Sequence, residues 1–318
     1  MSVFTPVSES QLAAWLRDYA VGSAVALEPI AAGIENTNYF ATTSQGRYVL
    51  TLFERLPAAE LPFYLDLMAH LARHGIPCPA PIADLNDRYL SSLNGKPAAL
   101  VTRLEGKSIE NPGAAECAEL GALLARMHLA ARSYGGYLEN PRGPRWWRAA
   151  APELRPFLDA PRAALLDEEL RFQAQHRFAD LPRAAVHADL FRDNALFAGA
   201  RLSGVIDFYF AGVDCFIYDL AVCANDWCLA DPRHDRRLDE CRTLAMLGAY
   251  AAVRAPQAEE RRAWPVMLRA AALRFWLSRL HDKHLPRPGE LVKVHDPEHF
   301  RDILAQRAAP GAQAPWAG

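Results

Sequence analysis

The sequence predicts an α+β fold with two lobes, a β-rich N-lobe followed by a larger and mostly helical C-lobe. The first hundred residues contain short runs that alternate apolar and polar side chains, as strands do. From residue 112 onward, apolar residues recur mainly at helical spacing. A polar segment at residues 105–111 separates the two patterns, and 318 residues are enough for two domains. We therefore expect an N-lobe over residues 1–104 and a C-lobe over residues 105–318.

The N-lobe is expected to begin with strands. Residues 24–30 and 37–43 each predict a strand, and the segment Gly33–Asn36 interrupts them. A turn at residues 44–46 then returns the chain as a further strand over residues 47–53. This pattern is typical of an antiparallel hairpin preceded by a glycine-bearing loop.

A single amphipathic helix is predicted over residues 58–74, because its apolar residues recur at helical spacing. Gly75 favours the end of this helix, and the prolines that follow exclude its continuation. Residues 88–104 predict a second hairpin, in which Asn94 and Gly95 supply the favoured two-residue turn.

The C-lobe opens with a long helical pattern at residues 112–132. Three short apolar runs interrupt the helices further on, at residues 184–187, 195–197 and 202–207, and each ends in a polar turn. We expect a small sheet there. The tail at residues 308–318 is rich in Ala, Pro and Gly and is expected to be mobile.

Composition and charge exclude several classes of protein. The net charge is −2, with no basic stripe that would hold a nucleic-acid backbone. No apolar stretch approaches the ~20 residues that span a membrane, and no signal peptide is recognised. The six cysteines form no C-x-x-C pair and are expected to be reduced thiols. We expect a soluble cytoplasmic protein; the sequence does not predict its oligomeric state.

The chemical signal is the run His187–Asn194 (HADLFRDN), with Asp207 thirteen residues further on. Two short strands can place Asp189, Asn194 and Asp207 at the mouth of one sheet. A carboxylate at this point can accept the proton of an attacking hydroxyl, and an amide and a second carboxylate can hold Mg²⁺ against the phosphates of ATP. The spacing therefore predicts phosphoryl transfer, with Asp189 catalytic and Asn194 and Asp207 as metal ligands.

The pattern H-x-D-x(4)-N followed by I-D-F resembles the catalytic and metal loops of the aminoglycoside phosphotransferase-like superfamily, whose members are relatives of protein kinases. The resemblance implies a protein-kinase-like fold and the same roles for the three residues. It also implies that His187 and Asp219, the latter in the run Y-D-L-A, act as structural braces.

Motifs in both lobes resemble the type II homoserine kinases more closely. They are G-I-E-N-T-N-Y-F, Y-V-L-T-L-F-E, L-P-F-Y-L-D-L-M, V-H-A-D-L-F-R-D-N and Y-D-L-A-V-C-A-N-D-W-C. The resemblance implies transfer of the γ-phosphate of ATP to the hydroxyl of L-homoserine, which gives O-phospho-L-homoserine on the way to threonine. Composition and spacing alone indicate a kinase, and only the resemblance indicates homoserine.

The nucleotide is expected to bind through main-chain and amide groups. Gly33, Asn36 and Asn38 would cover the phosphates. Backbone groups of Thr102, Arg103 and Leu104 would hydrogen-bond the adenine.

The sequence departs from its relatives at Thr51, where they carry Lys or Arg for the α- and β-phosphates. Arg47 and Arg55 are candidates to replace that residue, and Glu60 is a candidate for its acidic partner.

Homoserine is a zwitterion, so its pocket needs an anion and a cation. Tyr209, Asp214, Asp226 and Trp227 follow the metal loop and are candidates for the acceptor side. A late helix supplies Arg274, and also Arg279, for the carboxylate. Each has a structural alternative, because aspartate and arginine are common at helix surfaces and tryptophan is common in cores.

Three other functions fit parts of the pattern. The chain can be a kinase of another small hydroxyl compound, such as an aminoglycoside, choline or a sugar. It can be a nucleotide-binding pseudokinase, which the missing lysine favours and the complete motif opposes. A metallohydrolase that uses His187 and Asp189 would need further histidines nearby.

Overall fold

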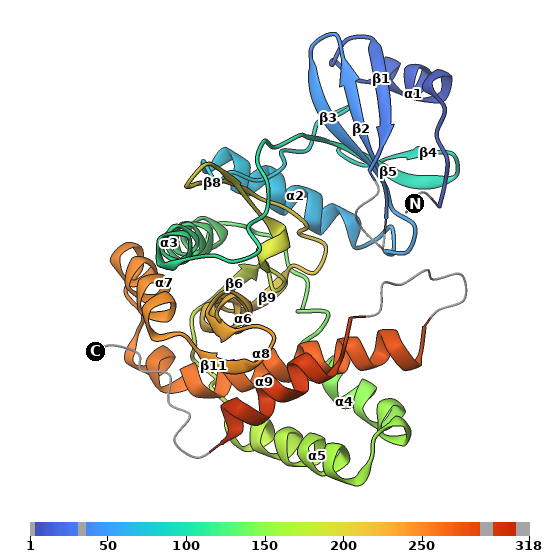
Figure 1. Cartoon of the computed structure of the whole chain (residues 1–318). Coiled ribbons are helices and arrows are strands. Elements are labelled where there is room, and N and C mark those ends of the chain that lie inside the picture. The colour runs from blue at the N-terminus through green and yellow to red at the C-terminus, as the bar shows by residue number, and fades with distance from the viewer. Residues whose placement is uncertain (1–3, 31–35, 287–294, 310–318) are drawn as a thin grey trace. The chain divides into compact units, whose positions relative to one another are not determined.

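The computed structural model describes residues 4–30, 36–286 and 295–309. These residues divide into two compact units (Figure 1). The described residues up to Glu105, joined by Gly204–Ile206, form the first unit. Gly106–Ser203 and the described residues from Asp207 onward form the second. Gly33 and most of the tail that we expected to be mobile lie outside the described residues.

The first unit is built on a five-stranded antiparallel sheet. Its order is β1-β2-β3-β5-β4. The strands are β1 (Ala24–Pro29), β2 (Thr37–Thr43), β3 (Gly46–Leu52), β4 (Ser91–Leu93) and β5 (Lys96–Thr102). Side chains of β2 alternate between buried and half-buried positions, as the sequence pattern requires. Both predicted hairpins are present, and Asn94 and Gly95 adopt the positive φ that a tight turn needs.

Two helices accompany this sheet. The short helix α1 (Glu9–Trp15) was not predicted, although Ser8 and Gln11 form a capping box at its start. Leu12 and Trp15 of α1 join Leu50 and Leu52 of β3 in one hydrophobic core. Helix α2 (Leu61–Arg73) is shorter than predicted, because a turn precedes Leu61 and Gly75 turns the chain with φ +76° after its end.

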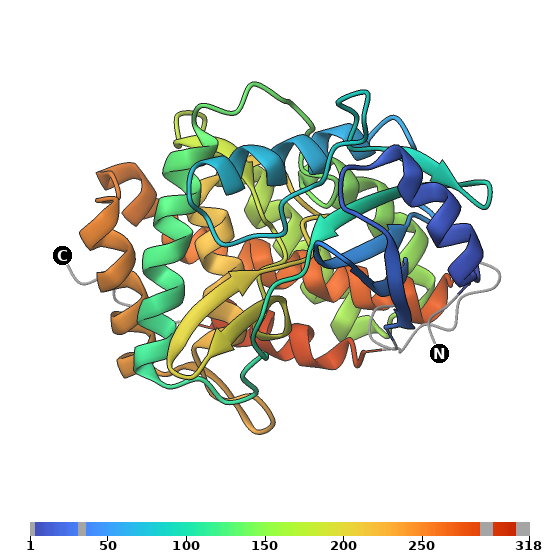
Figure 2. The same ribbon diagram turned by 90° about the horizontal axis from the view of Figure 1, so that it is seen from above.

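The second unit is mostly helical. Its helices are α3 (Ala114–Ala131), α4 (Pro144–Leu154), α5 (Ala160–Gln175), α6 (Phe216–Trp227), α7 (Glu240–Val253), α8 (Ala258–His284) and α9 (Glu298–Ala308). Every residue of α6 is buried, and α6 packs against α8 in the centre of the unit (Figure 1). Helices α3 and α7 run side by side (Figure 2). They approach closely at Gly121, where a Cβ atom would lie only 2.2 Å from the Met246 carbonyl oxygen.

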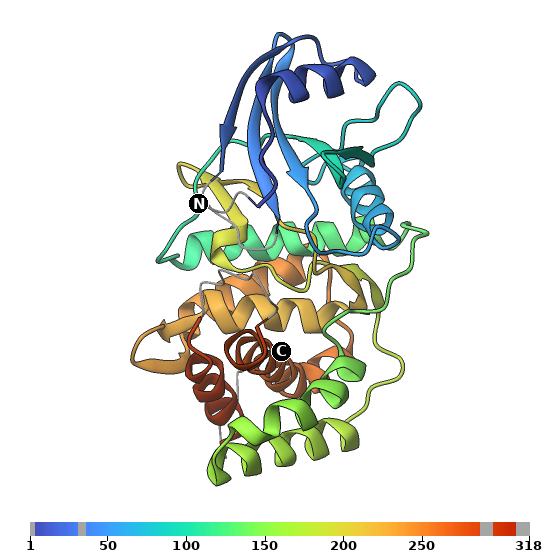
Figure 3. The same ribbon diagram turned by 90° about the vertical axis from the view of Figure 1, so that its right-hand side faces the viewer.

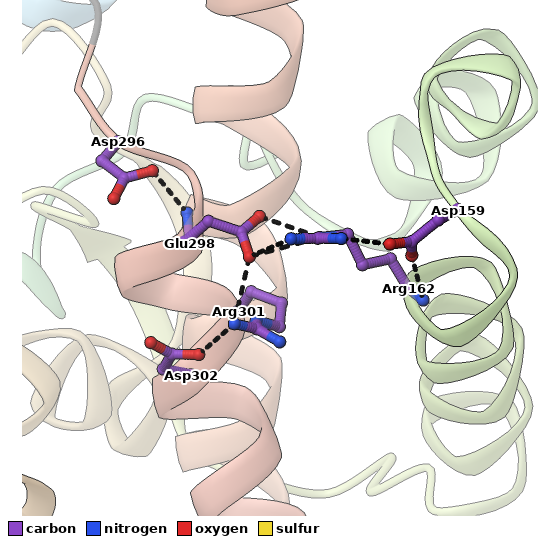
Figure 4. Close-up of polar contacts among 6 residues, drawn as sticks. All are labelled: Asp159, Arg162, Asp296, Glu298, Arg301 and Asp302. Atoms are coloured by element: carbon purple, nitrogen blue, oxygen red, sulfur yellow. Dashed lines mark hydrogen bonds and ion pairs between the residues drawn. The ribbon is translucent and has the colours of Figure 1, made fainter.

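Ion pairs connect α9 to α5 (Figure 4). Arg162 donates from Nε and Nη2 to Glu298 at 3.0 and 2.7 Å, and Glu298 also pairs with Arg301 at 3.0 Å. Such half-exposed pairs stabilise by less than about 1 kcal/mol each, but together they define one position of α9. That position places Phe300 against Phe275, with ring centroids 4.9 Å apart.

Three short strand pairs remain, and they lie in the second unit except for the end of β8, which belongs to the first. They are β6 (Arg183–Val186) with β9 (Gly212–Cys215), β7 (Ala195–Ala198) with β8 (Arg201–Val205), and β10 (Leu229–Asp231) with β11 (Asp235–Leu238). The first pair carries the segment with the predicted catalytic residues. In the parts of the chain that the structure describes, no helix is long and apolar enough to cross a membrane.

Candidate active site

The catalytic segment begins where β6 ends. His187 is fully buried, and Ala188 adopts a φ of +62°, which is unfavourable for a residue with a Cβ. Asp219 holds this turn: its Oδ2 accepts from the His187 N–H at 3.1 Å, and its Oδ1 accepts from the Ala188 N–H at 2.7 Å. These two bonds offset the ~1 kcal/mol cost of the left-handed residue. The turn directs Asp189 away from the core.

Asp219 belongs to a buried polar network that crosses four helices. It accepts from His128 Nε2 at 3.0 Å, and His128 Nδ1 accepts from the Tyr250 hydroxyl at 2.8 Å. Arg254 donates to Tyr250 at 3.1 Å and to Glu260 at 2.9 Å. Because Asp219 can only accept, Nε2 of His128 carries the proton.

The network fixes the charges of its two innermost members. Burial would raise the pKa of Asp219, but the hydrogen bonds and charge of its partners outweigh burial and hold the pKa below its usual value. Burial lowers the pKa of His128, and this effect outweighs the Asp219 carboxylate. The brace is therefore an ionised aspartate and a neutral histidine at neutral pH.

Asp189 is half-buried and lies beside Arg274. Their side chains approach to 3.3 Å between Asp189 Oδ1 and Arg274 Nη2. The Asp189 N–H donates to His187 Nδ1 at 3.3 Å. The Arg274 guanidinium is almost fully buried and lies 3.6 Å from the centre of the Phe275 ring.

Asn194 is tied directly to Asp189. Its Nδ2 donates to the Asp189 backbone carbonyl at 2.8 Å. With the nitrogen used in this way, Oδ1 of Asn194 is the atom of this side chain that could hold a cation. Asp207, two residues after β8, is exposed and has a φ of +65°. An amide oxygen and a carboxylate are hard ligands that suit Mg²⁺, which takes its other ligands from phosphate and water. Among the described residues there is no group of three His, Cys, Asp or Glu side chains that could hold a metal.

Asp226, which we predicted to bind substrate, is engaged with the catalytic segment itself. Its Oδ2 accepts from the backbone N–H and Nε of Arg192 at 2.9 and 3.0 Å, and its Oδ1 accepts from Arg192 Nη2 at 3.1 Å. Arg192 also donates to the Glu110 carbonyl at 2.6 Å. The prediction is corrected because a bidentate ion pair occupies this carboxylate. Its effect is to anchor the chain between Asp189 and Asn194.

Trp227 and Asp214 are two further residues that we predicted to bind substrate. Trp227 has no exposed surface, and its indole N–H donates to the Leu190 carbonyl at 3.1 Å, so it packs the core instead of contacting substrate. Asp214 pairs with Ala184 in the β6–β9 ladder, whereas Val186 at the catalytic end pairs with Gly212. This register places Asp214 roughly 7 Å further along the ladder. Tyr209 is half-buried and stands two residues after Asp207.

Arg279, the second predicted cation, is directed to α9. Its Nη1 donates to the Asp296 carbonyl at 3.1 Å, and its guanidinium lies 4.5 Å from the Phe300 ring. Burial lowers the pKa of Arg279 to about 10. Arg274 is therefore the cation of this helix that the structure brings to Asp189.

Two charged residues near Arg274, Arg142 and Asp282, were not predicted to belong to the site. The Phe210 ring lies 5.1 Å from the Arg274 guanidinium and 5.7 Å from that of Arg142. Asp282 lies two turns after Arg274 on α8, and burial raises its pKa despite the opposing charges of Arg142, His281 and Arg274. The spacing of Asp282 from Arg274 was visible in the sequence, but the proximity of Arg142 was not.

In the first unit, Thr51 occupies the predicted strand position without a cation. Its hydroxyl donates to Asn38 Oδ1 at 2.8 Å. Asn36 is buried, and its Oδ1 has no hydrogen-bond partner among the described residues. Arg47, one candidate to replace the missing lysine, pairs with Glu105 at 2.7 Å on the surface.

The segment predicted to hold adenine has few free donors. The N–H of Thr102 donates to the Ala80 carbonyl at 2.9 Å, and that of Arg103 donates to the Arg47 carbonyl at 3.2 Å. The Arg103 guanidinium lies 3.9 Å from the Phe40 ring. Of the three predicted residues, Leu104 is the one whose N–H is not used in these contacts.

Known proteins resemble this chain over almost its full length. The sequence profile of the phosphotransferase enzyme family matches residues 26–255. The homoserine kinase of Burkholderia mallei (strain SAVP1) is 50% identical over 99% of this chain and 98% of its own length. That of Paraburkholderia xenovorans (strain LB400) is 51% identical over 98% of both chains.

Solved structures share the fold. Amicoumacin kinase hAmiN, in complex with AMP-PNP, Ca²⁺ and Ami, has a TM-score of 0.69 over 95% of this chain and 92% of its own, with 16% identity. A spectinomycin phosphotransferase in complex with ADP and its antibiotic has a TM-score of 0.66 over 96% of both chains, with 14% identity. The predicted α+β class, with an antiparallel sheet in the N-terminal part and a helical C-terminal part, is confirmed.

Proposed function

Because the chain belongs to the homoserine kinases of the phosphotransferase enzyme family, we propose that it phosphorylates the hydroxyl of L-homoserine with ATP. The products are O-phospho-L-homoserine and ADP. The observation that carries the proposal is the contact of Asn194 Nδ2 with the Asp189 carbonyl, since it joins a catalytic carboxylate and a cation ligand in one segment. The identity of half of all positions to curated homoserine kinases supports the choice of acceptor.

Asp189 would orient the homoserine hydroxyl and take its proton. Phosphoryl transfer needs the acceptor in line with the γ-phosphorus and needs charge stabilisation, so orientation is the larger part of this role. Arg274 holds the carboxylate in place through the 3.3 Å contact. Asp219 and Arg192 fix the backbone on either side of Asp189.

Mg²⁺ fits the donor set of this site. Asn194 Oδ1 and the Asp207 carboxylate would hold the ion, which neutralises phosphate charge when it is bound. The remaining task of Asn194 is structural, since its Nδ2 fixes the Asp189 carbonyl. For the nucleotide, we assign the amides of Asn36 and Asn38 to the phosphates and the N–H of Leu104 to adenine.

The α-amino-acid end of homoserine needs a cation and an anion close together. Arg142 and Asp282 are suited to this role, because both lie near Arg274 in the second unit and their charges act on each other. Arg142 would bind the carboxylate and Asp282 the ammonium group. Phe210, against which both arginines lie, would contact the methylene groups of the substrate.

The direct test is ADP release from Mg-ATP with L-homoserine, L-serine, L-threonine, choline and kanamycin as acceptors. We expect turnover with L-homoserine and a loss of about 10²- to 10⁴-fold in kcat for Asp189→Asn. Equal Asp189-dependent turnover with another acceptor would contradict the proposed substrate. ATP binding without turnover on any acceptor would favour the pseudokinase.

A further inference from the structure

A cavity of about 420 Å³ lies within the second unit. Helices α4, α5 and α8 contribute to its walls, and α4 and α5 lie on the same side of α8 (Figure 3). Strand β9, helix α6 and residues 176–183 complete the lining. The walls are largely apolar, with contributions from Trp147, Leu170, Phe178, Leu181 and Met267.

Two polar groups stand out in this apolar lining. Asp214 accepts from Asn140 Nδ2 at 2.7 Å and from the Cys215 N–H at 2.7 Å, and burial raises the pKa of its carboxyl group. The Tyr218 side chain is 2% exposed, and its hydroxyl lies near Asn140 but makes no well-aligned hydrogen bond among the described residues. A buried hydroxyl without a partner costs ~1–3 kcal/mol, so a ligand that hydrogen-bonds to it would recover that loss.

Three cations also line the cavity. Arg148, Arg177 and Arg183 line it and are exposed to solvent. They come from α4, from the segment after α5 and from β6. The lining therefore combines positive charge, apolar walls and the polar groups of Asp214 and Tyr218.

We propose that this cavity is a binding site for a small carboxylate with an apolar body and a hydroxyl group at its far end. The arginines bind the carboxylate, and the walls enclose the apolar body. The hydroxyl donates to Asp214 and accepts from Tyr218. This site is distinct from the phosphoryl-transfer site in its lining, which includes none of Asp189, Asn194 and Asp207.

Two residues that line the cavity are close in sequence to residues that hold the catalytic segment in position. Tyr218 immediately precedes Asp219, which holds the His187 and Ala188 N–H groups. Ala270 lines the cavity one helical turn before Arg274, which contacts Asp189.

The test uses 3-(4-hydroxyphenyl)propionate and isothermal titration calorimetry on the full chain, with saturating ADP and L-homoserine present. We expect saturable binding of one molecule per chain. Ala174→Trp, an exposed cavity-lining position on α5, should abolish binding, whereas Ala164→Trp on the same helix outside the cavity should not. Tyr218→Phe should weaken binding about three- to tenfold, because it removes the hydroxyl that the ligand would contact.

Two matched molecules test the chemistry. 3-Phenylpropionate lacks the hydroxyl, so it should bind more weakly than the probe and equally to the original chain and to Tyr218→Phe. Tyramine carries the opposite charge and should not bind. The proposal fails if no saturable binding occurs up to ~1 mM, if Ala174→Trp leaves binding unchanged, or if tyramine binds better than the carboxylate.

Discussion

Arg274 Nη2 lies 3.3 Å from Asp189 Oδ1, so a nearly buried guanidinium is fixed beside the carboxylate that would receive the acceptor hydroxyl. The arginine is held by the Phe275 and Phe210 rings, at 3.6 and 5.1 Å from their centres. This relationship gives the carboxylate a defined position before substrate enters. The charge of Arg274 would therefore act on catalysis through Asp189, whereas the charges of Arg142 and Asp282 would act on substrate binding.

Arg274→Ala should lower kcat for homoserine phosphorylation by about 10- to 100-fold, because Asp189 loses the partner that orients it. Arg279→Ala is the matched control on the same helix, since Arg279 donates to the Asp296 carbonyl instead. Steady-state kinetics with varied homoserine give both constants. An equal fall in kcat for both variants would show that the contact with Asp189 has no special role.

Asn194→Ala should raise the Mg²⁺ concentration needed for half-maximal activity and should also lower kcat. The first effect follows from loss of the Oδ1 ligand, and the second follows from loss of the 2.8 Å bond to the Asp189 carbonyl. Asn194→Asp keeps an oxygen ligand but removes the Nδ2 donor. Titration of activity with Mg²⁺ should therefore show a nearly normal midpoint for Asn194→Asp and a shifted one for Asn194→Ala; coincident midpoints would rule out Asn194 as a ligand.

The sequence was sufficient for the fold class and the family, both of which are confirmed. Alternating strands, the Asn94–Gly95 turn and the spacing of His187, Asp189 and Asn194 are local signals, and local signals are readable from one chain. The relatives that are 50% identical confirm the resemblance to homoserine kinases.

The residues that we propose for the α-amino-acid end were harder to predict, because their proximity depends on contacts between distant parts of the chain. Asp219 and Asp226 are seven residues apart on α6, yet one holds the turn at His187 and the other pairs with Arg192. The spacing of residues in the sequence indicates neither the contact with His187 nor the contact with Arg192. Arg142, about 130 residues before Arg274, meets it across Phe210, and only the fold brings them together.

Asp282→Asn and Arg142→Gln should raise the KM for homoserine by about 10- to 100-fold with smaller effects on kcat. Substrates that lack one charge separate the two roles. Asp282→Asn should raise the KM for 3-aminopropan-1-ol and leave that for 4-hydroxybutyrate unchanged. Arg142→Gln should do the reverse. If each variant affects all three acceptors equally, neither residue contacts the charged end of the substrate.

The stability of the protein should fall as the pH drops below about 6.5. Burial lowers the pKa of His128, and it lowers that of His299 to about 3. The unfolded chain therefore binds protons near pH 6.5 that the folded chain does not bind, and each histidine removes up to about 1.4 kcal/mol per pH unit. Urea unfolding between pH 7.5 and about 4.5, above the carboxylate range, measures this slope. His299→Gln should make the slope shallower, and an unchanged slope would contradict the assignment.

The close packing of α3 on α7 should make Gly121 intolerant of any side chain. A Cβ atom at this position would lie 2.2 Å from the Met246 carbonyl oxygen, which is backbone and cannot rotate away. We expect Gly121→Ala to destabilise the protein by about 1–3 kcal/mol, because the helices must separate. Gly248→Ala, in the middle of α7 with no atom within 4 Å of its Cβ, should instead stabilise it by up to about 1 kcal/mol. The two melting temperatures should therefore move in opposite directions. Because α3 also carries His128, which braces Asp219, Gly121→Ala should lower kcat as well, whereas Gly248→Ala should leave kcat unchanged.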